Sequence, residues 1–198
     1  MKIQRIETLI KKGPFSHSPE MDQILEEVKK AVLSVNWPEG SKKFTLYPVK
    51  KANGVVPIKK NFLNHLVQNN WMLEHPMMIA ARQRPGKIDA VKSLSNERFF
   101  AVEWETGNIS SSHRALNKIA VGLLDGILAG GILVLPSRNM YQYLTDRVGN
   151  FAEIEPYFPI WRNLQIHDGV LAVIEIEHDA ISSDVPLIRK GTDGRALR

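Results

Sequence analysis

The sequence predicts an α/β protein with a central, mixed β-sheet flanked by helices, and three observations support this fold class. The chain has 198 residues, of which 43% are hydrophobic, and this is enough for one domain built around one core. Between residues 87 and 136 the sequence reads as strand, strand, helix, strand, so that a helix crosses from one strand to the next. Residues 132–135 are a continuous apolar run, which is typical of a strand buried on both faces.

The segments outside this region are predicted from apolar spacing and helix-start signals. Isoleucines spaced three and four residues apart give an N-terminal helix one apolar face, and a Ser-Pro pair marks the start of the next helix. The stretch 156–161 is aromatic and proline-rich, and it could cover the core or form a dimer surface. We expect one domain over 1–198, with its core at about 70–140 and a basic tail at 186–198. The expected helices are 1–12, 18–35, 58–70 and 141–147, and the expected strands are 44–49 and a peripheral one at 171–178.

Within the core, two strands form a hairpin that a helix follows. Residues 87–91 make a short strand, 93–98 the connection and 99–105 the second strand, where aromatic and β-branched residues occur without Gly or Pro. The serines at 110–112 offer an N-cap for a helix from His113 onward. Its buried stripe is expected to consist of Leu116, Ile119, Leu123 and Leu124.

Three acidic residues of this hairpin stand out. Side chains alternate along a strand, so Glu103 and Glu105 point to the same face, roughly 6–7 Å apart. Like charges this close raise each other's pKa, and a hard divalent cation such as Mg²⁺ would relieve the repulsion. If the strands pair, Asp89 reaches the same end of the sheet, which gives a metal-site geometry suited to phosphodiester hydrolysis. The alternative is an exposed strand whose acids face water.

The same residues carry a resemblance to a known family. Ile-Asp-Ala-Val-Lys at 88–92, followed by Ala-Val-Glu-Trp-Glu at 101–105 and a Ser/Arg-rich helix start, resembles the BamHI and BglII type of type II restriction endonucleases. These enzymes belong to the PD-(D/E)xK nuclease superfamily. The resemblance covers 87–138, about a quarter of the chain. The superfamily's usual lysine is Glu105 here, as in the BamHI branch.

The resemblance implies a PD-(D/E)xK-type core and a sequence-specific endonuclease that acts on double-stranded DNA. It implies Mg²⁺ as the cofactor, with Mn²⁺ able to substitute, and a homodimer, because cutting both strands of a palindrome needs two sites related by a twofold axis. Asp89 and Glu103 would bind the metal, and Glu105 would replace the lysine as base or ligand. Glu74 matches the family's upstream acid loosely, and its alternative is an exposed residue at a helix end.

Several basic and hydroxyl side chains are candidates for DNA contacts. The formal net charge of +5 suits a polyanionic partner without requiring one. Helix N-termini bind phosphate through free backbone amides, which favours the serine-rich helix start. For His113 the alternative is a solvent-facing residue of the first turn. The candidates are Lys87, Ser111, Ser112, His113, Arg114, Lys118 and Arg138.

Other features exclude some classes of protein and leave rival interpretations open. The chain has no cysteine, which excludes disulfides and thiolate metal sites. The N-terminus lacks an apolar signal core, and the apolar run 120–136 is interrupted by Asp125 and four glycines, so we expect a cytoplasmic protein without membrane contact. Glu175 and Glu177 repeat the acid-x-acid spacing, but no Asp-bearing strand or basic helix start follows them. The functional alternatives are a DNA repair or phage-defence nuclease without strict specificity, and a non-catalytic DNA-binding regulator.

Overall fold

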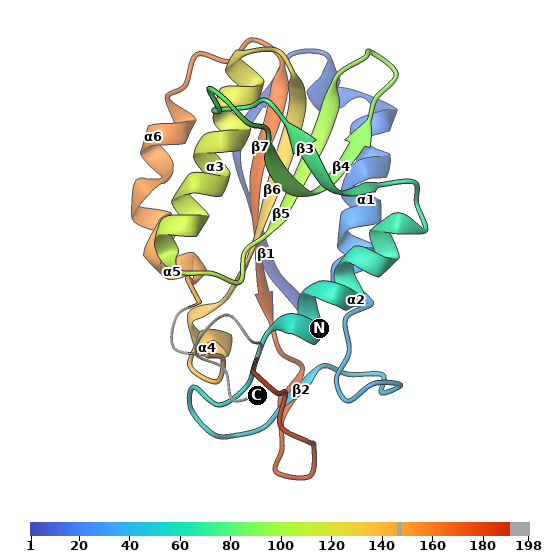
Figure 1. The fold of residues 1–198 in the computed structure, drawn as a ribbon, viewed down its shortest axis with the longest axis vertical. Helices are drawn as coiled ribbons and strands as arrows, with labels where there is room; N and C mark the ends of the chain where they lie inside the picture. Colours follow the sequence, from blue (N-terminus) through green and yellow to red (C-terminus); the bar gives the residue numbers. More distant parts are fainter. Residues whose placement is uncertain (146–147, 191–198) are drawn as a thin grey trace.

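A computed structural model describes residues 1–145 and 148–190, and its centre is a six-stranded mixed sheet in the order β1-β7-β6-β5-β4-β3 (Figure 1). Strands β5, β6 and β7 run parallel, β1 is antiparallel to β7, and β4 is antiparallel to β3 and β5. The predicted mixed sheet is therefore confirmed. The strands are β1 (Lys2–Lys12), β3 (Met72–Met77), β4 (Gly86–Ser93), β5 (Phe99–Trp104), β6 (Leu128–Pro136) and β7 (Gly169–Glu177), and a separate pair consists of β2 (Thr45–Leu46) and β8 (Ala180–Ile181).

Helices cover both faces of the sheet. Figure 1 shows α1 (Pro19–Leu33) and α2 (Val56–Val67) on one side, and α3 (Ile109–Leu124) with α5 (Phe151–Ile154) and α6 (Phe158–Arg162) on the other. Short segments complete the chain, namely α4 (Arg138–Tyr141), η1 (Phe15–His17) and η2 (Glu155–Tyr157). Among the described residues, no helix has the length and apolar character needed to cross a membrane.

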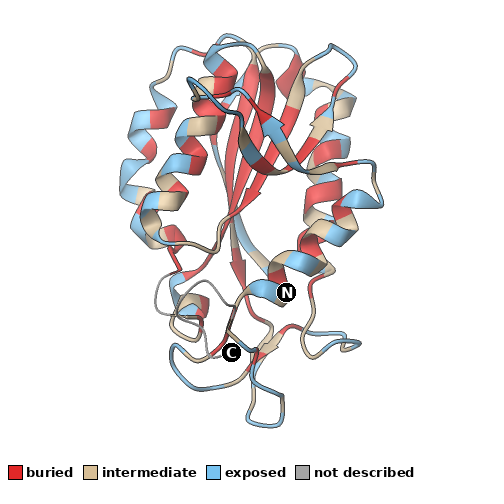
Figure 2. Ribbon diagram, in the orientation of Figure 1, coloured by how far each residue is buried: buried red, intermediate tan, exposed pale blue. Residues whose placement is uncertain are grey.

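The buried apolar residues form two clusters, one on each face of the sheet. Burial follows the central strands, as Figure 2 shows. Phe100, Val102 and Trp104 belong to the cluster under α1 and α2, whereas Ala101 belongs to the cluster under α3 and α6. The alternation expected for strand 99–105 is therefore confirmed, and it directs Glu103 toward the α3 side.

The N-terminal segment is a strand, so the predicted helix at 1–12 is wrong. Residues of β1 pair with β7 along its length, with register shifts between Ile3 and Arg5 and between Thr8 and Ile10. Each bulge moves the alternation of side chains by one residue. Ile3 and Ile6 therefore reach one cluster and Ile10 the other, and the helix-like spacing of the isoleucines results from bulges.

The strand predicted at 171–178 is not peripheral. It is β7, and it lies between β1 and β6 inside the sheet. Its apolar residues alternate between the two clusters, with Ala172, Ile174 and Ile176 on one face and Leu171 and Val173 on the other. The prediction is wrong because residues 1–12 form a strand, β1, which pairs with the outer edge of β7.

Helix boundaries agree with the sequence where a capping residue is unambiguous. Ser18 caps α1, and its Oγ accepts a hydrogen bond from the Met21 N–H at 3.1 Å, as predicted. Helix α3 begins earlier than expected, because the Asn108 side chain caps it by accepting from the Ser111 N–H at 3.2 Å. The serines at 110–112 thus lie inside the first turn. Leu124, the last residue of α3, is exposed and does not join the buried stripe.

The region after β6 differs from expectation in its helices. Helix α4 begins after Ser137, whose hydroxyl accepts from the Met140 N–H, so the helix lies three residues before the predicted 141–147. Residues 142–145 are not helical, and 146–147 lie outside the described residues. Phe158 and Trp161 are buried, so the stretch 156–161 covers the core. The tail from 191 onward lies outside the described part, whereas Ile188 is buried.

A buried ion pair ties α1 to the sheet and yields the first prediction. Glu27 pairs with Lys92 of β4 and accepts from the Trp71 Nε1–H at 2.8 Å. Burial raises the pKa of Glu27, but these donors outweigh it and the pKa is lowered. Removing one partner leaves a charge buried and unpaired, so Glu27→Ala should lower the free energy of unfolding by about 3 kcal/mol in urea denaturation.

The neighbouring residue supplies a matched control for that substitution. Glu26 pairs with Lys29 on the exposed face of the same helix. Exposed pairs contribute little, so Glu26→Ala should leave the denaturation midpoint unchanged. Equal losses from the two substitutions would show that burial of the Glu27 pair does not matter.

Candidate active site

Strands β4 and β5 bring Asp89 and Glu103 together. Ala90 pairs with Val102 across the antiparallel strands, so the next residues along, Asp89 and Glu103, lie side by side. The Asp89 N–H donates to Glu103 Oε2 at 3.3 Å, and Asp89 Oδ2 accepts from the Trp104 N–H at 2.9 Å. The main chain of the hairpin thus fixes one oxygen of each carboxylate.

Two lysines from opposite faces of the sheet neutralise this carboxylate pair. Lys59 of α2 places its Nζ 2.6 Å from Asp89 Oδ1. Lys118 of α3 donates from its Nζ to Glu103 Oε1 at 3.3 Å and to the Lys87 carbonyl oxygen at 2.7 Å. Sequence reasoning missed Lys59 as part of this site, because only its basic helix start was visible and the contact spans thirty residues.

The environment of Glu103 opposes its negative charge. Burial and the neighbouring Asp89 carboxylate raise the pKa of Glu103 to about 7, against the opposing effect of Lys118. The raised pKa means that Lys118 does not fully offset the effects of burial and of the Asp89 charge. A carboxylate that resists ionisation in this way is typical of a functional site.

Glu105 is turned toward its own loop. Its Oε1 accepts from the Gly107 N–H at 2.6 Å, and a Cβ at position 107 would lie 2.8 Å from that oxygen. Burial raises the pKa of Glu105, while the Gly107 N–H and the nearby Lys59 and Arg114 charges oppose the rise. In the described parts of the chain no three His, Asp or Glu side chains lie close enough together to hold a metal ion.

The chemistry of the donors nevertheless fits a hard divalent cation. Asp89 and Glu103 present carboxylate oxygens, which Mg²⁺ prefers, and Glu105 comes directly after the end of β5. Lys59 and Lys118 already supply positive charge to the same oxygens. The raised pKa of Glu103 shows that more positive charge would be favourable there.

Glu74 lies beside the cluster, but its carboxylate does not enter it. Its neighbours Leu73 and His75 pair with Ala90 and Ile88, on either side of Asp89. Glu74 has a positive φ of 48°, and its exposed side chain lies 3.7 Å from Lys87 Nζ. It stands on β3, so the alternative of a helix-end residue is wrong.

The DNA-contact candidates divide into exposed and enclosed residues. Lys87, Arg114 and Arg138 are exposed, Ser111 is partly exposed, and Lys118 is engaged with Glu103. These five remain available for contacts at the surface or at the carboxylate cluster.

Two of the candidates on α3 are enclosed. Ser112 is fully buried, so its hydroxyl is not available to a ligand in this structure. His113 packs edge-on against Tyr157, with ring centroids 4.6 Å apart, and also lies against Trp161. It is therefore partly buried against η2 and α6. Neither location was visible in the sequence, because both depend on packing between distant segments.

The rival acids of β7 are satisfied by protein groups. Glu175 pairs with Arg5 at 2.7 Å. Burial raises the pKa of Glu177, but hydrogen bonds from His178 and the Ser137 hydroxyl outweigh this effect and lower the pKa to about 2. Both acids therefore already have protein partners, which favours the hairpin acids as the candidate site.

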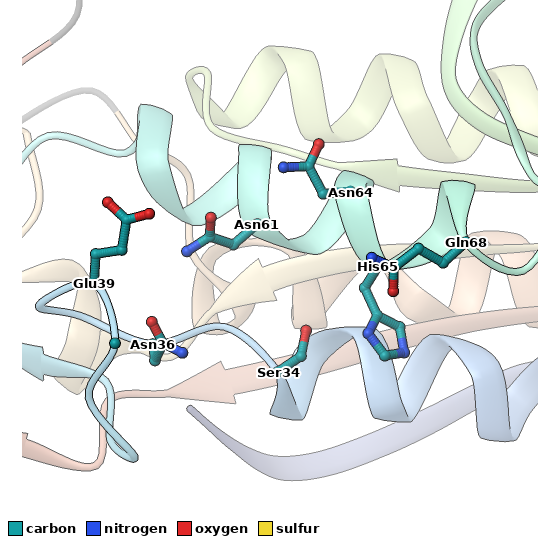
Figure 3. Close-up of a pocket in the computed structure, with 8 residues that line it drawn as sticks. Ser34, Asn36, Glu39, Asn61, Asn64, His65 and Gln68 are labelled. Atoms are coloured by element: carbon teal, nitrogen blue, oxygen red, sulfur yellow. The ribbon is translucent and has the colours of Figure 1, made fainter.

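A separate polar cavity of about 280 Å³ lies between α2 and the loop after α1 (Figure 3). In Figure 3, His65 of α2 points toward Ser34 at the end of α1, and Asn36 and Glu39 come from the following loop. The cavity shares no residue with the carboxylate cluster, and it holds one carboxylate and one imidazole. It lacks the paired acids that the hairpin provides.

Comparisons with known proteins connect this arrangement to one family. The family model for restriction endonuclease BamHI matches residues 1–195. The chain is 55% identical over 198 residues to the type II restriction enzyme OkrAI of Oceanobacter kriegii, with all of both chains covered. It is 39% identical over 185 residues to the type II restriction enzyme BamHI of Bacillus amyloliquefaciens, covering 90% of this chain and 84% of that one.

Solved structures show the same fold at low sequence identity. Restriction endonuclease BglII in complex with a DNA 16-mer aligns with a TM-score of 0.65 at 14% identity, covering 90% of this chain and 79% of that chain. Free BglII aligns with a TM-score of 0.55, also at 14% identity, covering 90% of this chain and 81% of that chain.

The raised pKa of Glu103 predicts how stability depends on pH. Glu103 contributes stability that is fully present below about pH 4.5, its ordinary pKa, and that is lost as the pH rises through about 7. In EDTA, Glu103→Gln should therefore gain stability relative to the unsubstituted protein between pH 4.5 and pH 8, by up to about 3 kcal/mol. Urea denaturation across this pH range measures the gain.

An exposed acid on the neighbouring strand serves as the control for this titration. Glu74→Gln removes a carboxylate that is largely in solvent, so the pH dependence of stability should stay as it is in the unsubstituted protein. A stability difference for Glu103→Gln that did not change with pH would contradict the raised pKa.

Proposed function

The chain belongs to the restriction endonuclease BamHI family, and on this premise we propose that it is a Mg²⁺-dependent type II restriction endonuclease that cuts double-stranded DNA as a homodimer. The observation that carries the proposal is the paired carboxylates of Asp89 and Glu103, with Glu105 directly after the end of β5. They occur in a chain that is 55% identical to a type II restriction enzyme over its full length.

Asp89 and Glu103 are the residues that would hold the cation. When bound, Mg²⁺ or Mn²⁺ supplies charge neutralisation at the scissile phosphate and lowers the pKa of a bound water. The Trp104 N–H orients Asp89, and Glu103 is held by the Asp89 N–H and Lys118. These contacts keep two acceptor groups in place before any substrate arrives.

Glu105 would accept a proton from the attacking water. A general base works best when its pKa lies near the working pH, and burial raises the pKa of Glu105 in that direction. Its Oε1 accepts from the Gly107 N–H, so Oε2 is the oxygen that would accept the proton. Glu74 could join the metal ligands only if its carboxylate moved away from Lys87, so we assign it no role in metal binding.

The DNA-contact proposal is narrowed to residues that the fold leaves accessible. Lys87 and Arg114 flank the carboxylates, and Arg138 opens α4 at the carboxyl end of β6. Ser111 lies in the first turn of α3, where free N–H groups favour a phosphate. The likeness to BglII, which was solved with a DNA 16-mer, supports this choice of ligand.

A homodimer follows from the chemistry of cutting both strands. One active site cuts one strand, so a palindromic site requires two copies related by a twofold axis. Tyr157 of η2 and Ile160 of α6 leave apolar surface exposed, which would suit a subunit contact. The two alternatives are separable by experiment, because a less specific nuclease gives smeared fragments and a DNA-binding regulator gives none.

Plasmid cleavage provides the direct test. The protein should yield discrete fragments with Mg²⁺ and none with EDTA. Asp89→Ala and Glu103→Ala should each reduce cleavage by at least about 10³-fold, since each removes a group that stabilises charge at the reacting phosphate. DNA binding, measured by electrophoretic mobility, should persist in both variants.

Glu175→Gln is the control for the choice of strand. It removes one charge of the rival acid-x-acid pair and should leave cleavage within about twofold of the unsubstituted enzyme, since Glu175 pairs with Arg5 away from the hairpin. Loss of cleavage in Glu175→Gln, with cleavage retained in Asp89→Ala, would place the active site on β7.

A further prediction concerns the phosphate contact proposed for Arg114. Each phosphate contact contributes about −0.9 to the slope of log affinity against log salt concentration for duplex DNA. Arg114→Gln should therefore make that slope shallower by about 0.9 per subunit. Arg162→Gln removes an arginine of α6 that pairs with Glu7, and it should leave the slope unchanged. Equal slopes for Arg114→Gln and the unsubstituted protein would move the phosphate contact elsewhere.

A further inference from the structure

Lys59 reaches the active site from a different layer of the molecule. It stands in the first turn of α2, on the face of the sheet opposite α3, and its Nζ lies 2.6 Å from Asp89 Oδ1. The other oxygen of Asp89, Oδ2, accepts from the Trp104 main chain. One oxygen of Asp89 is therefore fixed by the backbone, and the other is occupied by an ammonium group.

The two lysines of the site are anchored differently. Lys118 donates to the Lys87 carbonyl oxygen as well as to Glu103, so it keeps a partner if Glu103 takes another ligand. Among the contacts of the described residues, the Lys59 ammonium has Asp89 alone. Its side chain is 29% exposed on a flexible four-carbon stem, which lets it move without disturbing the core.

A divalent cation and the Lys59 ammonium have to compete for the same oxygen. Asp89 Oδ1 is the oxygen that the main chain leaves free, and a hard cation prefers such carboxylate oxygens. Without any counter-charge, Asp89 and Glu103 would repel each other across adjacent strands. The Lys59 ammonium therefore keeps the two carboxylates in place. It also lowers the affinity of Asp89 Oδ1 for the divalent cation, because both bind the same oxygen.

We propose that Lys59 is a positioning residue that holds Asp89 Oδ1 while no metal is bound and yields this oxygen when a divalent cation enters. The proposal rests on the proposed function, because it requires Asp89 to be a metal ligand. Lys59 thereby lowers the affinity for the cation and keeps the metal site formed in its absence. It also gives the cluster a lysine, although position 105 carries none.

Binding of Mn²⁺ to the full chain without DNA tests this exchange, with free Mn²⁺ followed by electron paramagnetic resonance. Lys59→Met removes the competitor, so Mn²⁺ should bind about fivefold to tenfold more tightly. Lys59→Gln should increase the Mn²⁺ affinity to the same extent, and it serves as the test variant if Lys59→Met folds poorly. Lys59→Arg retains the charge and should stay within about twofold of the unsubstituted protein.

The next residue supplies the matched control. Lys60 is exposed on the same turn of α2, so Lys60→Met removes the same charge without touching Asp89 and should leave Mn²⁺ affinity unchanged. If Lys60→Met bound Mn²⁺ as tightly as Lys59→Met does, the gain would come from the loss of any nearby positive charge. That result would overturn the proposal.

Asp89→Asn separates failure of this inference from failure of the proposed function. If Asp89→Asn binds Mn²⁺ as well as the unsubstituted protein does, Asp89 is not a ligand and the proposed metal site falls with the inference. If Asp89→Asn weakens binding while Lys59→Met and Lys59→Gln bind no more tightly than the unsubstituted protein, the metal site stands and the role of Lys59 is wrong. Thermal unfolding of each variant confirms that the compared proteins are folded.

Discussion

The repulsion between two neighbouring carboxylates is the constraint on which the arrangement of this site depends. Asp89 and Glu103 lie side by side on β4 and β5, and the burial of Glu103 limits the screening of their charges by water. One lysine from each face of the sheet offsets this repulsion: Lys59 of α2 pairs with Asp89, and Lys118 of α3 pairs with Glu103. Each of the two helix layers therefore contributes one positive charge to the same pair of carboxylates.

The close packing of α3 on the sheet determines where Lys118 can reach. A Cβ at Gly131 of β6 would lie 2.6 Å from Ile119 Cγ2, and one at Gly130 would lie 2.4 Å from the Phe100 ring. The two glycines therefore allow side chains to approach β6 from both faces. Ile119 follows Lys118 directly, so the depth at which α3 sits on β6 also sets the position of the ammonium. Packing in the core and charge at the site are coupled through this helix.

Local patterns could be predicted from the sequence, whereas contacts between distant segments could not. The alternation of Phe100 with Ala101, the β4–β5 hairpin and the Ser18 cap depend on a few adjacent residues, and all were predicted. The strand β1 was missed because two bulges give its isoleucines a helix-like spacing. The proximity of Asp89 to Glu103 could be anticipated from the hairpin, but the Lys59 contact could not, since it needs the placement of α2 against β4.

The charge balance of the cluster explains why a glutamate suits position 105. Asp89, Glu103 and Glu105 carry three negative charges when ionised, and Lys59 and Lys118 supply two positive charges in contact with the first two acids. The cluster then has one negative charge in excess, and a divalent cation would turn this into one positive charge that faces a phosphate. A lysine at 105 would give the same positive charge before any metal arrived, and it would oppose the entry of the cation. With Lys59 already present, a negative charge at Glu105 would keep the site attractive to a metal.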